Sequence, residues 1–493
     1  MDSRLFTPPV APEVRWRQFE ERVLGEFQGF FDAESPIVGA RAPGRLDVMG
    51  GVADYSGSVV LEMPISEAAY VAWQWRDDRL FRILSLAPEA VDFQPYLEIS
   101  LDALVNSEGR LRPISEVRAA LTGDSRTRWA SYLLGCFYMM LHAYTKVTQG
   151  IVDSRLGERG ANILLESDVP LGAGVSSSAA IEVATMHALS EAAGIHPSNL
   201  TFAAWCQKAE NHIVGAPCGI MDQVTSALGA EGMLLALRCQ PHNLLGNYRI
   251  PRGWRFVGID SRVKHSVGGS AYTKARVGAF MGLKVIQLES GGKLLENYLC
   301  QMKPDEFATY RELIPDTLTG AEYTALYGLL PDTITRVLPE ETYHPRLCAE
   351  HPILENDRVL KFMAVLRYVE ECELMGEDTQ DPAIMWEVGQ LMYAAHASYS
   401  DRLNLGSPET DLIVHLVKKR GAESGLFGAK ITGGGAGGTV AILCLDTPEA
   451  EQSLLGVCTE YQHHTQVEPY LFMGSSPGAV SFGARMIERG RGF

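Results

Sequence analysis

The sequence predicts an α+β protein, and three observations support this class. Segments with strand character and segments with helical character follow one another without the regular rhythm of a doubly wound sheet. Of the 493 residues, 46% are hydrophobic and 21% are charged, which is typical of a chain that forms a large core. A chain of this length predicts either one large domain or two to three ordinary ones. We predict an N-terminal domain over residues 1–240 and a C-terminal domain over 241–493.

The expected elements follow in chain order. An amphipathic helix over 15–33 precedes two apolar, β-rich segments at 58–65 and 68–75, which have the composition of strands. Residues 128–147 are almost continuously apolar over a helical length and predict a buried helix. Residues 160–194 predict a strand, a glycine-rich loop and a long helix. The remaining predictions are a helix ending near Gly215, strands over 233–240 and 254–263, a helix-rich stretch over about 275–400, a strand–loop–strand unit over 429–445, and a last strand over 469–475.

Charge and cysteine usage exclude several functional classes. A net charge of −17 argues against a nucleic-acid partner, because an acidic surface repels phosphodiester backbones. No apolar stretch reaches about 18 residues, the length needed to span a bilayer, and residues 1–23 contain no signal-peptide core. The nine cysteines form no C-x-x-C pair or Cys/His cluster, which is typical of reduced thiols. We therefore expect a cytoplasmic protein with no nucleic-acid or membrane partner. We also expect a monomer or a weak dimer.

The stretch VPLGAGVSSSAAIEVA (169–184) carries the clearest chemical signal. Gly172 and Gly174 permit backbone shapes that side chains with a Cβ resist, and three serines then open a helix. Loop N–H groups and a helix N-terminus together make an anion site, and hydroxyls add donors to phosphate or a ligand to Mg²⁺. A capped helix would need one serine, so three favour phosphate binding. The Lys of a Walker A loop is absent.

Two further segments point to the same site. The loop TGGGAGG (432–438) has more glycines than a hairpin requires, which favours close approach to a ligand. In AENHIVGAPCGIMDQ, Glu210 and Asp222 have apolar neighbours, so inward-facing carboxylates are expected there. Such carboxylates need a cation or a substrate hydroxyl as partner. A solvated helix face for Glu210 and a capping role for Asp222 remain the structural alternatives.

The first motif, RAPGRLDVMGGVADYSGSVVLEMPI (41–65), places Arg45, Asp47 and Asp54 around Gly50 and Gly51. A turn needs glycine and at most one aspartate. An arginine and two carboxylates within so short a stretch therefore indicate a functional site.

Together these segments resemble the galactokinase branch of the GHMP small-molecule kinase superfamily. The three motifs of that superfamily occur here in order, as APGRLDVMGG to ADYSG, PLGAGVSSSAA and KITGGGAGGT. The resemblance covers the chain from about 41 to 445, although the helix-rich stretch over 275–400 is longer than the family pattern and has no assigned role. It implies a GHMP kinase fold of two domains with the active site in the cleft between them.

The resemblance also implies roles for residues that match the family motifs. Asp222 would be the catalytic carboxylate near the anomeric hydroxyl, with Arg45 as its cationic partner. Mg²⁺ would be held by Ser178 and Glu210. The sugar-binding residues would be Asp54, Gly51, Val52, Tyr55, Gly219 and Tyr272. The ATP-binding residues would be Trp129, beside the adenine, with Gly172, Ala173, Gly174, Ser176, Ser177, Ser178, Gly434 and Gly435.

One departure from the family pattern bears on the substrate. Galactokinases carry GEHTDY where this chain has GGVADY (50–55), so the Glu and His positions are Gly51 and Val52. In the family that pair faces the exocyclic hydroxymethyl group at C6. L-Arabinopyranose has the ring hydroxyl pattern of D-galactopyranose without that group. We therefore predict phosphorylation of L-arabinose by ATP to give β-L-arabinose 1-phosphate and ADP.

Residues 41–65 also resemble the kinase region of plant L-arabinokinases, here without their large N-terminal extension. The main alternative substrate is D-galactose, which would give α-D-galactose 1-phosphate. A non-catalytic sugar sensor is a further alternative, which the complete second motif and the presence of Arg45 and Asp222 disfavour.

Overall fold

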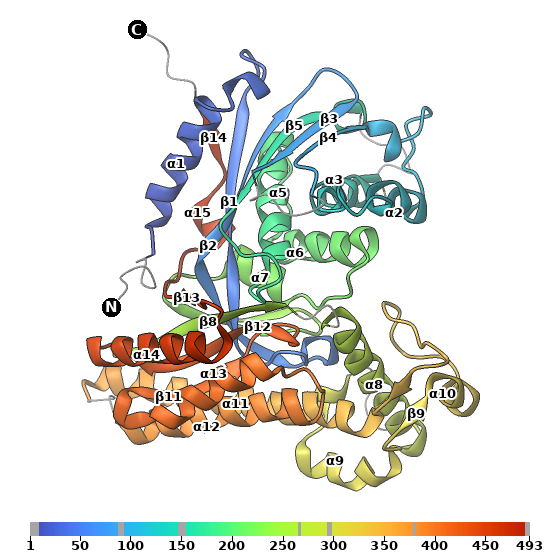
Figure 1. Cartoon of the computed structure of the whole chain (residues 1–493). Helices are drawn as coiled ribbons and strands as arrows, with labels where there is room; N and C mark the ends of the chain where they lie inside the picture. The colour runs from blue at the N-terminus through green and yellow to red at the C-terminus, as the bar shows by residue number, and fades with distance from the viewer. Residues whose placement is uncertain are drawn as a thin grey trace.

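The computed structural model describes residues 9–86, 93–145, 154–264, 268–292, 298–377 and 381–488. It confirms the α+β class, with two larger β-sheets, a two-stranded sheet, and helices packed against both larger sheets (Figure 1). Within the described residues, no helix is long and apolar enough to cross a membrane. All nine cysteines lie in this part of the chain and are free thiols.

An eight-stranded sheet carries the first motif. Its strands follow the order β14, β1, β2, β5, β3, β4, with β6 paired to β2 and β7 paired to β6. Of the pairings described, β3 with β5 is parallel and the others are antiparallel. The bounds are β1 Ile37–Met49, β2 Val59–Trp75, β3 Leu80–Ser85, β4 Tyr96–Ser100, β5 Ala161–Ser167, β6 Met233–Arg238, β7 Asn243–Arg249 and β14 Arg485–Ile487.

Helices cover both faces of this sheet (Figure 1). Helix α1 (Pro12–Leu24) lies on one face, where Trp16 and Phe19 are buried against β2. The other face carries the buried helix predicted over 128–147, which is α3 (Ala130–Thr145). Around it lie α2 (Ile114–Thr122), α5 (Ser177–Ala193), α6 (Asn199–Lys208), the π-helical turn Ala209–Val214 and α7 (Met221–Leu228).

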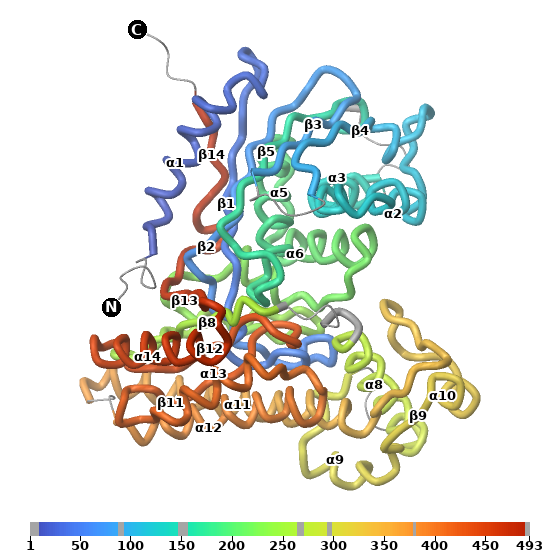
Figure 2. The backbone as a smooth tube through the Cα atoms, viewed as in Figure 1, coloured from blue at the N-terminus to red at the C-terminus, as the bar shows by residue number. Residues whose placement is uncertain are grey.

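A four-stranded sheet, ordered β11, β12, β8, β13, carries the third motif. Long helices cover it, as the tube in Figure 2 shows, and a smaller group of helices extends from its end. The bounds are β8 Trp254–Lys264, β11 Leu426–Ile431, β12 Gly437–Leu445, β13 Tyr470–Phe472, α8 Gly268–Glu289, α9 Pro304–Tyr310, α10 Gly320–Tyr327, α11 Pro345–Met375, α12 Pro382–Asp401, α13 Pro408–Arg420 and α14 Pro448–Thr465. The short strands β9 (Leu318–Thr319) and β10 (Thr342–Tyr343) pair with each other.

Several element boundaries differ from the predictions. The two strands expected at 58–65 and 68–75 form the single strand β2, and the helix expected over 15–33 ends at Leu24, followed by a short 3-10 turn over 28–30. The strand predicted over 469–475 is not the last, because α15 (Ala479–Phe482) and β14 follow it. Strand β14 returns to the first sheet and pairs with β1.

The predicted boundary at residue 240 remains a prediction. The hydrogen-bonded sheets nevertheless place β7 and β14, both beyond residue 240, in the sheet of the N-terminal half. The C-terminal segment also contacts that half through the Gly478 N–H, which donates to the Gly229 carbonyl at 2.8 Å.

Candidate active site

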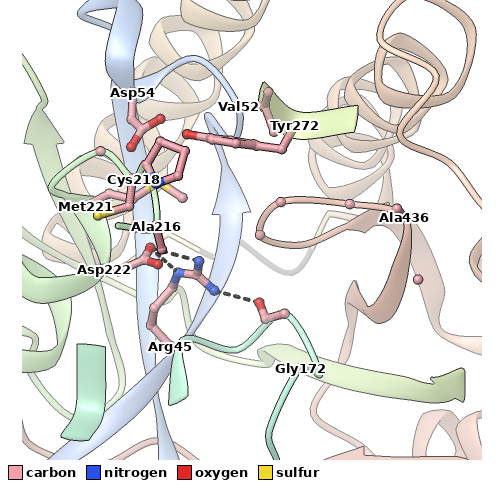
Figure 3. A pocket seen from close by; sticks show the side chains of 17 residues that line it. Arg45, Val52, Asp54, Gly172, Ala216, Cys218, Met221, Asp222, Tyr272 and Ala436 are labelled. Atoms are coloured by element: carbon pink, nitrogen blue, oxygen red, sulfur yellow. Dashed lines mark hydrogen bonds and ion pairs between the residues drawn. The ribbon is translucent and has the colours of Figure 1, made fainter. Parts of the chain in front are cut away.

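The three motifs converge on one cavity of about 440 Å³ (Figure 3). The first motif contributes side chains from β1 and the turn after it, and the other two contribute glycine-rich loops. Residues 216–222 and α8 close the remaining sides. The lining consists of Arg45, Val52, Asp54, Gly172, Gly174, Ala216, Pro217, Cys218, Gly219, Met221, Asp222, Tyr272, Gly433, Gly434, Gly435, Ala436 and Gly437.

Arg45, which is buried, and Asp222, which is partly exposed, form an ion pair at the base of this cavity. Arg45 Nε donates to Asp222 Oδ1 at 2.8 Å, and its NH1 group donates to the Gly174 carbonyl at 2.7 Å. The Ser176 hydroxyl donates to the other oxygen of Asp222. Because β1 fixes Arg45 and the first turn of α7 fixes Asp222, the pair joins two elements far apart in sequence.

Arg45 also faces Glu62 of β2, whose Oε2 lies 3.2 Å from Arg45 Nε. Burial alone would lower the pKa of Arg45, but the carboxylates of Asp222, Glu62 and Asp47 hold that pKa above its usual value. The guanidinium therefore stays charged. The sequence prediction missed Glu62, which stands in an apolar strand segment and gave no motif signal.

The second and third glycine-rich loops pack backbone against backbone. The Thr439 hydroxyl donates to the Ala173 carbonyl at 2.7 Å. A Cβ added to Gly433 would lie 2.6 Å from the Gly174 carbonyl oxygen, closer than side chains allow. Part of the glycine content of TGGGAGG is therefore explained by contact with the other loop, and Gly434 and Gly435 face the cavity.

Asp54 lies at the opposite side of the cavity from the Arg45 base, close to Gly219 and Tyr272 (Figure 3). Its side chain is buried, and a Cβ on Gly219 would stand 1.4 Å from Asp54 Oδ2. Burial, and then the negative charge of Asp222, raise the pKa of Asp54 to about 6. A carboxylate in such a place favours a ligand that donates hydrogen bonds to it.

Glu210 and Ser178 meet beside the second loop. The Ser178 side chain acts to lower the pKa of Glu210, and Gln223 Nε2 donates to Glu210 Oε2 at 2.8 Å. Burial, and then the charge of Asp222, raise the pKa of Glu210 to about 7. Carboxylate and hydroxyl oxygens are the donors that Mg²⁺ prefers, so this pair fits the predicted metal. The described residues contain no group of three or more acidic, His or Cys side chains that could hold a metal by itself.

Gly51 corrects the sequence interpretation. It is absent from the cavity lining, and a Cβ there would stand 1.9 Å from both Asp47 Oδ2 and the Tyr399 hydroxyl oxygen. The missing side chain at position 51 therefore does not open space toward the sugar, because Asp47 and Tyr399 already fill that space. Val52 does line the cavity, beside Tyr272 (Figure 3).

The other predicted residues lie outside the cavity lining. Tyr55 is buried behind Tyr272, with 6.1 Å between their ring centroids. Ala173 is buried within the second loop, Ser176 immediately precedes α5, and Ser177 and Ser178 begin that helix. Trp129 packs against Phe93 and donates from its indole to the Gln94 carbonyl at 3.0 Å. The assignment of Trp129 to an adenine site remains a prediction.

Arg276 is a second residue that the sequence prediction missed. It forms a buried ion pair with Asp332 at 2.9 Å, and its guanidinium lies 5.3 Å from the centre of the Tyr55 ring. It follows Tyr272 by one helical turn of α8, and this spacing could have indicated that both face the same side.

Comparisons with known proteins agree with this geometry. The family model "GHMP kinases N terminal domain" matches residues 138–230, and "Galactokinase galactose-binding signature" matches residues 25–74. An L-arabinokinase from Arabidopsis thaliana is 38% identical over 94% of this chain, which spans about half (48%) of that longer protein. A galactokinase from Chloroflexus aggregans is 30% identical over 85% of this chain and 87% of its own length.

Solved structures show the same fold. The crystal structure of a Lactococcus lactis galactokinase complexed with galactose aligns with a TM-score of 0.70 at 20% identity, covering 96% of this chain and 99% of that one. With the match to the Chloroflexus galactokinase, which this chain covers nearly in full, the family is established: the chain belongs to the galactokinase branch of the GHMP kinases.

Proposed function

We propose that this protein is an ATP-dependent sugar 1-kinase that phosphorylates the anomeric hydroxyl of L-arabinose, giving β-L-arabinose 1-phosphate and ADP. The observation that carries the proposal is the Arg45–Asp222 ion pair in a cavity bordered by two glycine-rich loops. Phosphoryl transfer depends on positioning and charge neutralisation more than on covalent help. A fixed guanidinium, a carboxylate and a set of loop N–H groups supply both requirements.

Each side chain has a role in this scheme. Asp222 orients the anomeric hydroxyl or accepts its proton, and Ser176 and Arg45 hold the carboxylate in place. The second Arg45 contact, to the Gly174 carbonyl, keeps the guanidinium close to the loop that would cradle the phosphates. Ser178 and Glu210 would hold Mg²⁺, which when bound neutralises phosphate charge. Asp54 would accept hydrogen bonds from ring hydroxyls.

Two observations favour L-arabinose. Val52 presents an apolar wall to the cavity at the position where galactokinases carry histidine. A hydroxymethyl group against this wall would lose its hydrogen-bond partners, which costs about 1–3 kcal/mol or roughly 5- to 150-fold in kcat/KM. The identity of 38% with the Arabidopsis L-arabinokinase, against 30% with the Chloroflexus galactokinase, supports the same substrate.

D-Galactose is the second candidate. The galactose-binding signature over residues 25–74 and the overall likeness to a galactokinase fold favour it. The selectivity expected from one unsatisfied hydroxyl is modest, so slow turnover of D-galactose is expected even if L-arabinose is preferred.

The experiment is ADP release from Mg·ATP with L-arabinose and D-galactose measured side by side. Faster turnover of L-arabinose, abolished by Asp222→Asn, would support the proposal. Preference for D-galactose would retain the kinase assignment and reject the argument from Val52. No turnover of either sugar would reject the kinase proposal for both and favour a sensor.

A further inference from the structure

Helix α11 holds the turn that carries Val52. The Gly50 N–H donates to Glu355 Oε1 at 3.0 Å, and the Gly51 carbonyl lies 3.0 Å from His351 Nε2. His351 and Glu355 are four residues apart on α11, so they project from one face of the helix. Both side chains are fully buried. This helix belongs to the stretch for which the sequence indicated no role.

The contacts of His351 fix its protonation. A carbonyl only accepts hydrogen bonds, so Nε2 must carry the proton that it donates to Gly51. The other ring nitrogen, Nδ1, then accepts from the Ser398 hydroxyl at 2.8 Å. Burial lowers the pKa of His351 to about 3, so the ring stays neutral and keeps this single arrangement.

The turn that these contacts hold is strained. Val52 has a φ of +54°, in the left-handed region that a β-branched residue rarely adopts. Such a conformation persists only where the surrounding structure determines it, and it is found mainly at functional sites. Here it directs the Val52 side chain to the cavity wall next to Tyr272 (Figure 3).

Helix α12 closes the other side of the turn. The Tyr399 hydroxyl lies 3.2 Å from Asp47 Oδ2 and 3.2 Å from the Gly433 carbonyl oxygen. Together with Asp47 it occupies the space beside Gly51, so the turn has no room to shift in that direction. The turn is therefore held by hydrogen bonds from α11 and by packing from α12.

We propose that His351 and Glu355 are positioning residues for sugar selectivity: they clamp the Gly50–Val52 turn so that Val52 excludes a pyranose with an exocyclic hydroxymethyl group. This inference rests on the proposed sugar kinase activity and assigns selectivity to a helix that does not touch the sugar. Releasing the turn would let Val52 withdraw, which relieves its strained φ and admits D-galactose. The ratio of kcat/KM for L-arabinose to that for D-galactose would then fall.

The experiment compares His351→Phe with His351→Gln, both measured on the two sugars. Phe keeps an aromatic ring but cannot donate to Gly51, whereas the Gln amide can. We expect the selectivity ratio to fall at least about 5-fold in His351→Phe and to return toward the wild-type value in His351→Gln. The ratio does not depend on the fraction of folded enzyme, because both sugars are tested on one preparation. A matched control is His396→Phe, a buried histidine of α12 that contacts Ile431 and Asp411, not the turn.

Every outcome decides the question. If His351→Phe does not fold, Ser398→Ala removes only the partner of Nδ1 and should shift the ratio in the same direction by a smaller factor. An unchanged selectivity ratio in both His351→Phe and Ser398→Ala overturns the inference while leaving the kinase proposal intact. A fall in His396→Phe equal to that in His351→Phe does the same. A wild-type protein that releases no ADP with either sugar overturns the proposed function and this inference together.

Discussion

Replacing Gly219 with alanine should disable sugar binding without unfolding the protein. The new Cβ would stand 1.4 Å from Asp54 Oδ2, whereas ordinary contact begins at 3.4 Å, so the carboxylate must withdraw by about 2 Å. The obstructing atom is the end of a side chain, so Asp54 moves and the backbone stays. We therefore expect the free energy of unfolding to change by less than about 1 kcal/mol.

The loss of sugar binding is expected to be larger than the loss of stability. A hydrogen bond to a charged carboxylate contributes about 1.5–3 kcal/mol, so losing one such bond to the sugar lowers kcat/KM roughly 10- to 150-fold. The assay is ADP release at saturating Mg·ATP with L-arabinose varied, and we expect the effect mainly in KM. Gly29→Ala is the matched control, because a Cβ there meets no atom within 4 Å.

A double variant tests whether Gly219→Ala lowers kcat/KM by displacing Asp54. If Gly219→Ala acts through Asp54, then adding it to Asp54→Asn should cost little more than Asp54→Asn alone. Wild-type kcat/KM in Gly219→Ala, or full additivity of the two changes, would refute the assignment of Asp54 to the sugar.

Two further predictions concern buried charge. The pKa of Glu210 is raised from about 4.5 to about 7, so between these pH values the folded state keeps a proton that the unfolded chain releases. The contribution of protonated Glu210 to the free energy of unfolding is therefore complete below about pH 4.5 and is lost as the pH rises through 7. Between pH 4.5 and 8 the free energy of unfolding should fall by roughly 3 kcal/mol less in Glu210→Gln than in the wild type. The measurement is urea unfolding without Mg²⁺, and an unchanged pH profile would contradict the prediction. Lys430→Met should destabilise the fold by about 3–5 kcal/mol in the same assay, because it leaves Asp47, paired at 2.9 Å and fully buried, without its cation. Asp47→Asn added to Lys430→Met should recover part of that loss, and a purely additive double variant would contradict the pairing.

The second motif could be predicted from the sequence because its structure is local. Gly172, Gly174 and the serines before and at the start of α5 lie within seven residues, and φ values of +70° and +77° are ones that glycine adopts readily. The buried helix over 128–147 and the third motif loop were predictable for the same reason, since their apolar composition and glycine content lie within one segment.

Strand β1 could not be predicted in this way. Its buried polar residues break the apolar pattern of an internal strand, and their partners lie far away in the chain. Arg41 donates to the Ser476 hydroxyl, Arg45 to Asp222, and the Asp47 carboxylate pairs with Lys430. These polar residues can be buried only because partners that lie between 177 and 435 positions further along the chain neutralise their charges or accept their hydrogen bonds.

The interpretation of Gly51 failed for a related reason. The sequence indicates that a side chain is missing, but the direction in which that side chain would point depends on the turn. The group that fills the space, the Tyr399 hydroxyl, comes from a helix about 350 residues away. Which of two neighbouring positions lines the cavity is a tertiary property, and here it is Val52.

The return of the chain to β1 has a consequence for the order of folding during synthesis. Strand β1, which carries Arg45, has β2 on one side and β14 (Arg485–Ile487) on the other. A ribosome that has made the first 300 residues has supplied β2 but not the strand that covers the outer edge. Until β14 emerges, residues 37–39 at that edge offer unpaired N–H and C=O groups to other nascent chains. We therefore expect the eight-stranded sheet to reach its final form only after β14 has left the ribosome, and shielding of this edge by a chaperone would improve the yield of folded protein.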